Sequence, residues 1–198
     1  DHVEDFNVRS KRNALLEQVI RACQAITGML HGCMSANSAF CFLRLGMFIE
    51  RADMTSRLID VGGVFIAQEV ESTEIEQYDN ILWATILKSI GIYFMYRQTV
   101  QIEINGPSVI EFLIHNDDSF RSLKYCVLVI EDSISVLPNA EKTLKSTHHT
   151  KQLIEKNLDF GVGSTLLHDY LDLIQLSLSE IHQNCYDTWF YPDKSDRH

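Results

Sequence analysis

Apolar residues recur at intervals of three and four along most of this chain, the spacing that places them on one face of a helix. No stretch shows the sustained alternation of apolar and polar residues that marks a half-buried strand. Turn and capping residues separate the periodic segments, and the connections between segments are short. We therefore predict an all-α helical bundle of about six to seven helices, mostly antiparallel neighbours. The predicted helices cover residues 10–32, 38–61, 79–100, 107–115, 120–136, 139–158 and 164–190.

The predicted boundaries depend on individual capping and breaking residues. Gly62-Gly63 marks the end of the second helix or a point shortly before it, and the acidic, polar segment 67–78 is predicted as a loop. Asp79 and Ser119 are the predicted N-caps of later helices. Gly161-Val162-Gly163 is predicted as a turn and not as a phosphate-binding loop, because it lacks the GxGxxG spacing and a preceding strand.

The helix predicted around residues 42–61 carries charges in an otherwise apolar sequence. At about 100° per residue, Glu50, Asp53, Arg57 and Asp60 fall on one strip, with apolar residues on both sides. We expect this helix to be buried or nearly so and its charges to be paired, because an unpaired buried charge is costly. The apolar flanks are Cys41, Leu45, Phe48, Ala52 and Ile59 on one side and Met47, Met54, Leu58 and Val61 on the other.

Two roles are open for the charged strip. One is an internal ion-pair network that fixes the register of the helix, since Arg57 stands four residues after Asp53 and three before Asp60. The other is a polar cleft, formed with Arg51, that binds a small ligand or a peptide terminus. Arg121, near the N-terminus of a later helix, either faces an anion or pairs with Asp117 or the charged strip.

The composition narrows the function classes. We expect a single globular domain over residues 1–198, with residues 1–9 and 191–198 frayed, since 45% of the residues are hydrophobic and no linker is visible. The net charge of −10 and the pI near 5.2 argue against nucleic acid or a membrane surface as partner. The five cysteines, an odd number without CxxC spacing, are typical of reduced, core-packed thiols in a cytoplasmic protein.

The sequence supports neither a metal site nor an assigned catalytic residue. A ferritin-like di-metal site needs Glu-x-x-His pairs, whereas Glu111 and His115, like His168 and Asp172, stand four residues apart. No cysteine-protease signature surrounds the thiols. We predict no metal ligands and no cofactor, and we favour a non-catalytic role.

The spaced charges of the second helix resemble a known family signature. The residues Leu45-Gly46-x-x-x-Glu50-Arg51-Ala52-Asp53-Met54-Thr55-x-Arg57-x-x-Asp60-Val61 are similar to that of the bacterial Alpha-E helical domain family. The resemblance continues at Tyr96-Arg97, at Phe112-Leu113-Ile114 and at Phe120-Arg121-Ser122, and covers about residues 15–190. It implies a cytoplasmic bacterial all-α protein encoded beside ATP-grasp ligase-like and transglutaminase-like proteins.

Three functional readings are open for this chain. The first is an accessory or binding subunit of an ATP-grasp/transglutaminase-type peptide-modifying system, and the second is an enzyme of that pathway acting on an amide or peptide. The third, a carboxylate-bound metalloprotein, comes from the carboxylates of the helical bundle and not from the resemblance. Family members are usually longer, with a related Leu-Gly…Glu-Arg-Ala helix in their first half, so the chain resembles a short or C-terminal portion. We then expect a homo-oligomer, because self-association would cover the apolar surface left exposed.

Overall fold

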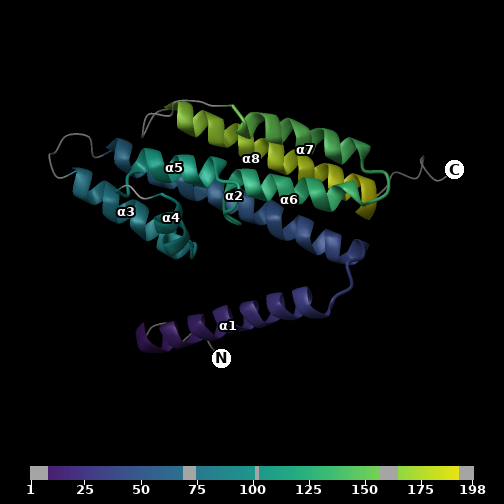
Figure 1. Ribbon diagram of the computed structural model, residues 1–198, viewed down its shortest axis with the longest axis horizontal. Coiled ribbons are helices and arrows are strands. Elements are labelled where there is room, and N and C mark those ends of the chain that lie inside the picture. The colour runs from purple at the N-terminus through teal and green to yellow at the C-terminus, as the bar shows by residue number, and fades with distance from the viewer. Residues whose placement is uncertain (1–8, 69–74, 101–102, 157–164, 192–198) are drawn as a thin grey trace. The chain divides into compact units, whose positions relative to one another are not determined.

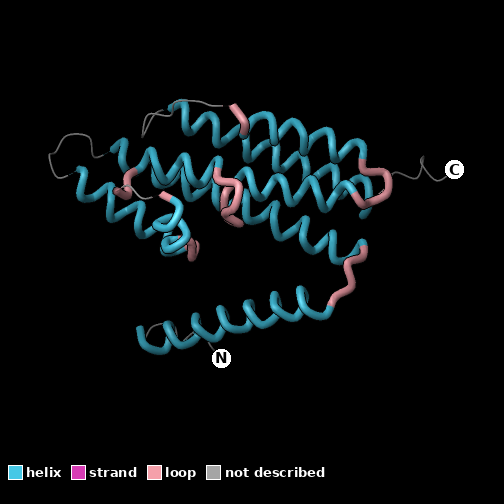
Figure 2. The backbone as a smooth tube through the Cα atoms, in the orientation of Figure 1, coloured by secondary structure: helices cyan, strands magenta, loops and turns pink. Residues whose placement is uncertain are grey.

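The computed structural model describes residues 9–68, 75–100, 103–156 and 165–191, and the rest of the chain lies outside the described residues. The described part consists of helices joined by loops and turns, without a strand (Figure 2). The all-α prediction is confirmed, with eight α-helices in this part of the chain against the six to seven expected. The elements are α1 (Arg9–Cys33), α2 (Ser38–Gln68), α3 (Ile75–Ser89), α4 (Tyr93–Thr99), α5 (Gly106–His115), α6 (Leu123–Ser135), α7 (Glu141–Ile154), α8 (Thr165–Cys185) and a π-helix (Tyr186–Phe190).

The chain divides into two compact units, residues 1–41 and residues 42–198. The first unit contains α1, drawn in purple in Figure 1, and the first turn of α2. The second unit contains the rest of α2 and all later helices. Most of the residues predicted to be frayed, 1–8 and 192–198, lie outside the described residues.

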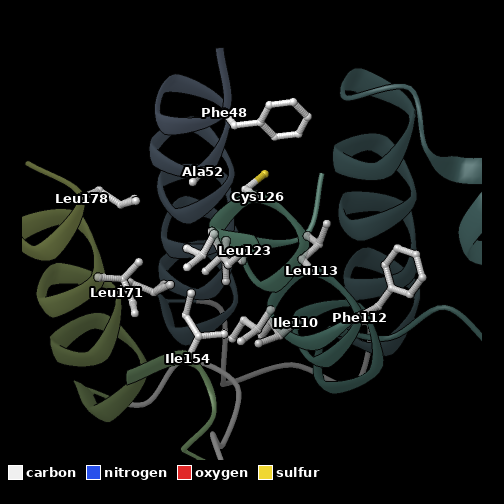
Figure 3. Packing of buried hydrophobic residues seen from close by; sticks show 14 of the residues in the cluster. Phe48, Ala52, Ile110, Phe112, Leu113, Leu123, Cys126, Ile154, Leu171 and Leu178 are labelled. Atoms are coloured by element: carbon white, nitrogen blue, oxygen red, sulfur yellow. The ribbon is translucent and has the colours of Figure 1, made fainter. Parts of the chain in front are cut away.

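One apolar core holds the second unit together. In this unit α7 packs along both α6 and α8, and α5 packs on α6 (Figure 1). The predicted inner flank of α2 lies in the same core, where Leu45, Phe48, Ala52 and Ile59 are all buried. Figure 3 shows Phe48 and Ala52 on α2 together with core residues of the other helices. Apolar contact along this flank therefore fixes which side of α2 faces inward.

The helix α2 continues past the glycines predicted to mark its end. It extends to Gln68, with Gly62 and Gly63 buried inside it. A Cβ atom on Gly62 would lie 2.7 Å from Trp83 Cη2, and one on Gly63 would lie 3.1 Å from Leu167 Cδ2. The two glycines therefore allow the close approach of α3 and α8 to α2 and do not end the helix.

The predicted helix 79–100 is two helices, which is the main reason for the higher helix count. Gly91 adopts a positive φ of 77° between α3 and α4, a conformation that glycine adopts without steric cost. Asp79 was predicted to cap this helix but lies within α3, which begins at Ile75. Its Oδ2 instead accepts a hydrogen bond of 3.0 Å from the backbone N–H of Gly106, at the start of α5.

The later helix boundaries differ from the predicted ones by a few residues. The N-cap of α6 is Ser122, whose Oγ accepts from the Tyr125 N–H at 3.1 Å, so the prediction of Ser119 is wrong. The α7 helix is shorter than predicted and ends at Ile154. The α8 helix begins at Thr165 and passes into the π-helix. The turn predicted at residues 161–163 lies outside the described residues.

Candidate functional site

The charged strip of α2 is partly exposed, with Asp53 and Asp60 half-buried. The side chain of Arg57 is 58% exposed, and Glu50 is also exposed. On the outer flank, Met54 and Val61 are 47% and 51% exposed. The prediction that both sides of the strip are buried therefore holds only in part, because Met47 and Leu58 of this flank pack against the core while Met54 and Val61 are exposed.

One ion pair predicted within the strip is present. Arg57 donates from Nε to Asp53 Oδ2 at 2.8 Å and from Nη2 to Asp53 Oδ1 at 3.1 Å. The hydrogen bond and charge of Asp53 raise the pKa of Arg57 above its usual value. A pair this exposed contributes little to stability. Asp53 and Arg57 therefore form an ion pair on the surface of α2 that adds little to the stability of the fold.

Asp60 has a partner that the sequence analysis did not name. Its Oδ1 lies 2.8 Å from His168 Nδ1 on α8, and the other ring nitrogen of His168 lies 3.6 Å from Asp172 Oδ2. The hydrogen bond and charge of Asp60 raise the pKa of His168. The charged strip therefore makes two separate interactions. Asp53 and Arg57 pair within α2, and Asp60 connects α2 to His168 on α8.

Arg51 points to a different place from its neighbour Glu50. It is half-buried, with Cζ 4.6 Å from the ring centroid of Phe48 and 5.4 Å from that of Phe120. Its Nη1 donates to the backbone carbonyl of Phe120 at 3.3 Å. Stacking on two aromatic rings holds the guanidinium in place, as expected for a cation over ring faces. Adjacent helical residues point about 100° apart, so Glu50 stays in solvent.

Arg121 lies beside the same ring. Its Cζ is 6.0 Å from the Phe120 centroid, and its Nε is buried without a hydrogen-bond partner. Of the alternatives left open for Arg121, the pair with Asp117 is not observed among the described residues, where Asp117 Oδ1 pairs with Lys124 Nζ at 2.8 Å. Within the described residues, neither Arg51 nor Arg121 forms an ion pair with a carboxylate.

The positive charges of Arg51 and Arg121 repel each other. Burial lowers the pKa of Arg51, and the positive charge of Arg121 lowers it further. Arginine still remains protonated at neutral pH, so the site carries two positive charges with only partial access to water. Such a pair is destabilised by mutual repulsion and is stabilised by an anion, which guanidinium groups bind through paired hydrogen bonds.

The turn between α5 and α6 fixes the position of Arg121. The Asn116 side chain accepts hydrogen bonds from the backbone N–H groups of Asp118, at 3.0 Å, and of Ser119, at 2.7 Å. The buried Ser122 hydroxyl donates to the backbone carbonyl of Asn116 and caps α6. These hydrogen bonds fix the conformation of the turn, and with it the backbone positions of Phe120 and Arg121.

The nearest thiol is not activated. Cys126 is buried, and its Sγ lies 3.7 Å from the carbonyl oxygen of Phe120. Burial raises its pKa to about 12 despite the two nearby arginines. The protonated thiol is a poor nucleophile. Cys126 and Cys185 are buried as predicted, whereas Cys23 and Cys33 are exposed and Cys41 is only partly buried.

A hollow in the second unit lies away from Arg51 and Arg121, and none of the predicted site residues lines it. Its volume is about 170 Å³, and its lining is mostly apolar. The hollow is lined by Phe42, Leu45, Gly46, Ile49, His182, Cys185, Tyr186 and Phe190.

In the described part of the chain, no group of three or more His, Cys, Asp or Glu side chains is arranged to hold a metal ion.

Both arginines stand out in the sequence, but their positions in the chain do not show that they approach the same ring. The aromatic partners Phe48 and Phe120 were also missed as parts of the site. Phe48 precedes Arg51 by three residues on the helix, and Phe120 adjoins Arg121, so a search for aromatics beside isolated arginines would have found both.

These features define an all-α helical domain with an unneutralised arginine pair beside its longest helix. None of its described helices is both long enough and apolar enough to span a membrane. The model of the Alpha-E family, described as a predicted α-helical domain with a conserved ER motif, matches residues 2–190. The chain therefore belongs to the Alpha-E family. No curated protein and no solved structure matches it.

The family match refines two predictions. It begins at residue 2, so it takes in nearly the whole chain and not a portion of it. Glu50-Arg51 is the one Glu-Arg step in the sequence, so the motif that gives the family its description falls on the helix that carries Arg51. The arginine of this step is the one that reaches the candidate site.

Proposed function

We propose that this protein is a binding subunit that holds an anionic group, a peptide carboxylate, between Arg51 and Arg121. The observation that carries the proposal is that two guanidinium groups lie near the same Phe120 ring, at 5.4 and 6.0 Å from its centroid, with no carboxylate partner within the described residues. The Nε of Arg121 is also buried and unpaired. Burying such a donor without a partner costs free energy, and a bound anion removes that cost. Phe48 and Phe120 supply an apolar wall beside the charge.

The proposed role is an accessory one, in a cytoplasmic bacterial system that modifies peptides with ATP-grasp ligase-like and transglutaminase-like components. A carboxylate is the group that a ligase of this kind activates, so a subunit that presents a peptide terminus suits it. The absence of an activated thiol at Cys126 supports binding over catalysis at this place.

Peptide binding tests whether the site recognises a carboxylate group. Acetyl-trialanine with a free C-terminus is titrated into the protein by calorimetry beside the same peptide as its C-terminal amide. We expect the amide to bind at least about tenfold more weakly, since a charge-assisted hydrogen bond contributes about 1.5–3 kcal/mol. Arg51→Met and Arg121→Met should each weaken binding of the acid by a similar factor.

Arg57→Met is the matched control, because it removes an arginine from the same helix at an exposed position. It should leave the affinity within about twofold, as expected for a distant surface charge. Equal binding of acid and amide contradicts the proposal, as does an Arg51→Met affinity no worse than that of Arg57→Met.

Two further measurements separate the alternative functions. A stable complex with the ATP-grasp ligase-like protein, without turnover of peptide by this chain alone, favours the accessory role. Hydrolysis or transfer of a peptide amide by the purified chain favours the pathway enzyme. Stoichiometric metal in protein purified without chelator favours the carboxylate metalloprotein.

A further inference from the structure

Apolar residues on α1 follow a heptad repeat. Leu16, Cys23 and Leu30 occupy the first position of successive heptads, and Val19, Ile26 and Cys33 occupy the fourth. This is the spacing that forms a continuous seam between two helices wound about each other. We call these six residues the α1 seam. The positions beside it are also mostly apolar and include Leu15, Ile20, Ala22 and Met29.

The apolar face of α1 is exposed. Its large residues Leu16, Val19, Ile20, Ile26 and Met29 are between 47% and 65% exposed. Among the described residues of the first unit, α1 and the first turn of α2 are the only helical segments, so nothing within this unit covers the face. A continuous apolar face of this size marks an interaction surface.

The sequence of α1 also requires a partner for its stability as a helix. Gly28 and Gly32 each lower helix propensity by about 1 kcal/mol relative to alanine. Nothing lies within 4 Å of a Cβ built at either position, so close packing does not explain them. An isolated helix in water is marginal even with good helix formers, and packing of its apolar face supplies the rest.

We propose that the α1 seam pairs with the same seam of a second copy of this chain, as an antiparallel helix pair. In one register Leu16 faces the partner's Cys33, Val19 faces the partner's Leu30, and Cys23 faces the partner's Ile26. Every seam residue of both copies then meets another seam residue. The match is symmetric, as a two-fold interface requires, because each contact between two positions occurs twice.

The charges of α1 select the antiparallel orientation. Arg12 stands seven residues before Val19, at the fourth heptad position that precedes the seam. A parallel pair would place the two Arg12 side chains opposite each other, and like charges repel. The antiparallel pair separates them by most of the helix length, which for 25 residues is about 37 Å and well beyond the Debye length of about 10 Å.

The polar face of α1 favours a protein partner over a lipid surface. A helix that lies on a membrane carries many Lys and Arg residues on its polar face. Between Asn13 and Asn37, this chain has Arg21 as its single Lys or Arg, and Arg21 pairs with Glu17 at 3.5 Å. The polar face is therefore close to neutral along the whole seam.

Cysteine cross-linking of the full chain tests both the pairing and its direction. In the proposed register no native thiol faces another thiol, so the wild type should stay uncross-linked under mild oxidation. Leu16→Cys places a thiol opposite the partner's Cys33 and should give a disulfide-linked dimer, mapped by mass spectrometry of peptides. Ala14→Cys, on the outer face, is the control and should give none. A Cys23–Cys23 link in the wild type would overturn the antiparallel register.

Light scattering after size exclusion tests the pairing without added thiols. The wild type should elute as a dimer, and Ile26→Glu should raise the dissociation constant at least about tenfold, because it places a charge in the apolar seam. Gln24→Glu adds the same charge on the outer face and should leave the dimer intact. A wild type that is monomeric at the cross-linking concentration overturns the proposal, as does an intact dimer of Ile26→Glu. Either result leaves the Arg51–Arg121 site untested and unaffected.

Discussion

Gly62 of α2 lies directly against the indole ring of Trp83 on α3. A Cβ atom at Gly62 would be 2.7 Å from Trp83 Cη2 and 2.9 Å from Ile86 Cδ1. Trp83 is fully buried, so its ring cannot move away without displacing other core residues. The contact between these two helices therefore depends on the missing side chain.

Gly62→Ala should destabilise the protein. Overpacking of a filled core costs about 1–3 kcal/mol, which exceeds the gain in helix propensity of about 1 kcal/mol. Gly46→Ala is the matched control on the same helix, where a Cβ would meet nothing within 4 Å. It should stabilise by about 0.5–1 kcal/mol. Urea unfolding of both variants measures the difference, and a Gly62→Ala variant more stable than the wild type would contradict the packing described.

Ser122→Ala should cost about 1–2 kcal/mol, because it removes the N-cap of α6 and the hydroxyl that donates to the part-buried carbonyl of Asn116. Ser135→Ala, at the exposed far end of the same helix, is the control and should change the free energy of unfolding by less than about 0.5 kcal/mol. If both substitutions have the same effect, the turn that carries Arg121 is not braced by Ser122.

Cys126 and Cys185 should resist alkylation in the folded protein. Burial raises the pKa of each thiol to about 12, so at about pH 8 only about one in ten thousand is a thiolate. Iodoacetamide followed by mass spectrometry should label both residues only after the protein is unfolded in denaturant. Labelling of native Cys126 at the rate of a free peptide thiol would mean that a reactive nucleophile lies beside the two arginines. That result would favour the alternative that this protein is an enzyme.

Asp60→Asn should lower the pKa of His168, which the hydrogen bond and charge of Asp60 raise. The stabilisation from this pair is fully present below the unfolded pKa of about 6.5 and is lost as the pH rises through the higher folded value. A titration followed by NMR measures the pKa in each variant. Asp132→Asn removes a carboxylate paired with Arg44 on another part of α2 and should leave His168 unchanged. A His168 pKa insensitive to Asp60→Asn would show that the pair does not persist in solution.

Sequence periodicity predicted the helices because the spacing of apolar residues is a local property of the chain. It also predicted the inner flank of α2 correctly, at Leu45, Phe48, Ala52 and Ile59. It could not show that Met54 and Val61 face water, since periodicity tells which residues share a face but not what that face meets. The break at Gly91 was missed because one glycine within an apolar pattern is compatible with a continuous helix.

The candidate site was harder to predict for a physical reason. Arg51 and the Phe120 carbonyl are 69 residues apart in the chain, and Asp60 and His168 are 108 apart. Such pairings depend on how helices pack, which the sequence of one helix does not contain. Local spacing could name Arg51 and Arg121 as unusual residues, but only the folded chain shows that both approach the ring of Phe120.

The same separations have a consequence for the newly made chain. The helices α6, α7 and α8 pack on neighbours in sequence, whereas α2 reaches His168 across 108 residues. At a synthesis rate of about 5–20 residues per second, about 5–20 s pass between the addition of Asp60 and that of His168. During that time the apolar flank of α2 has no completed surface to cover it. The contact between Asp60 and His168 is thus one of the later ones to become available as the chain is made.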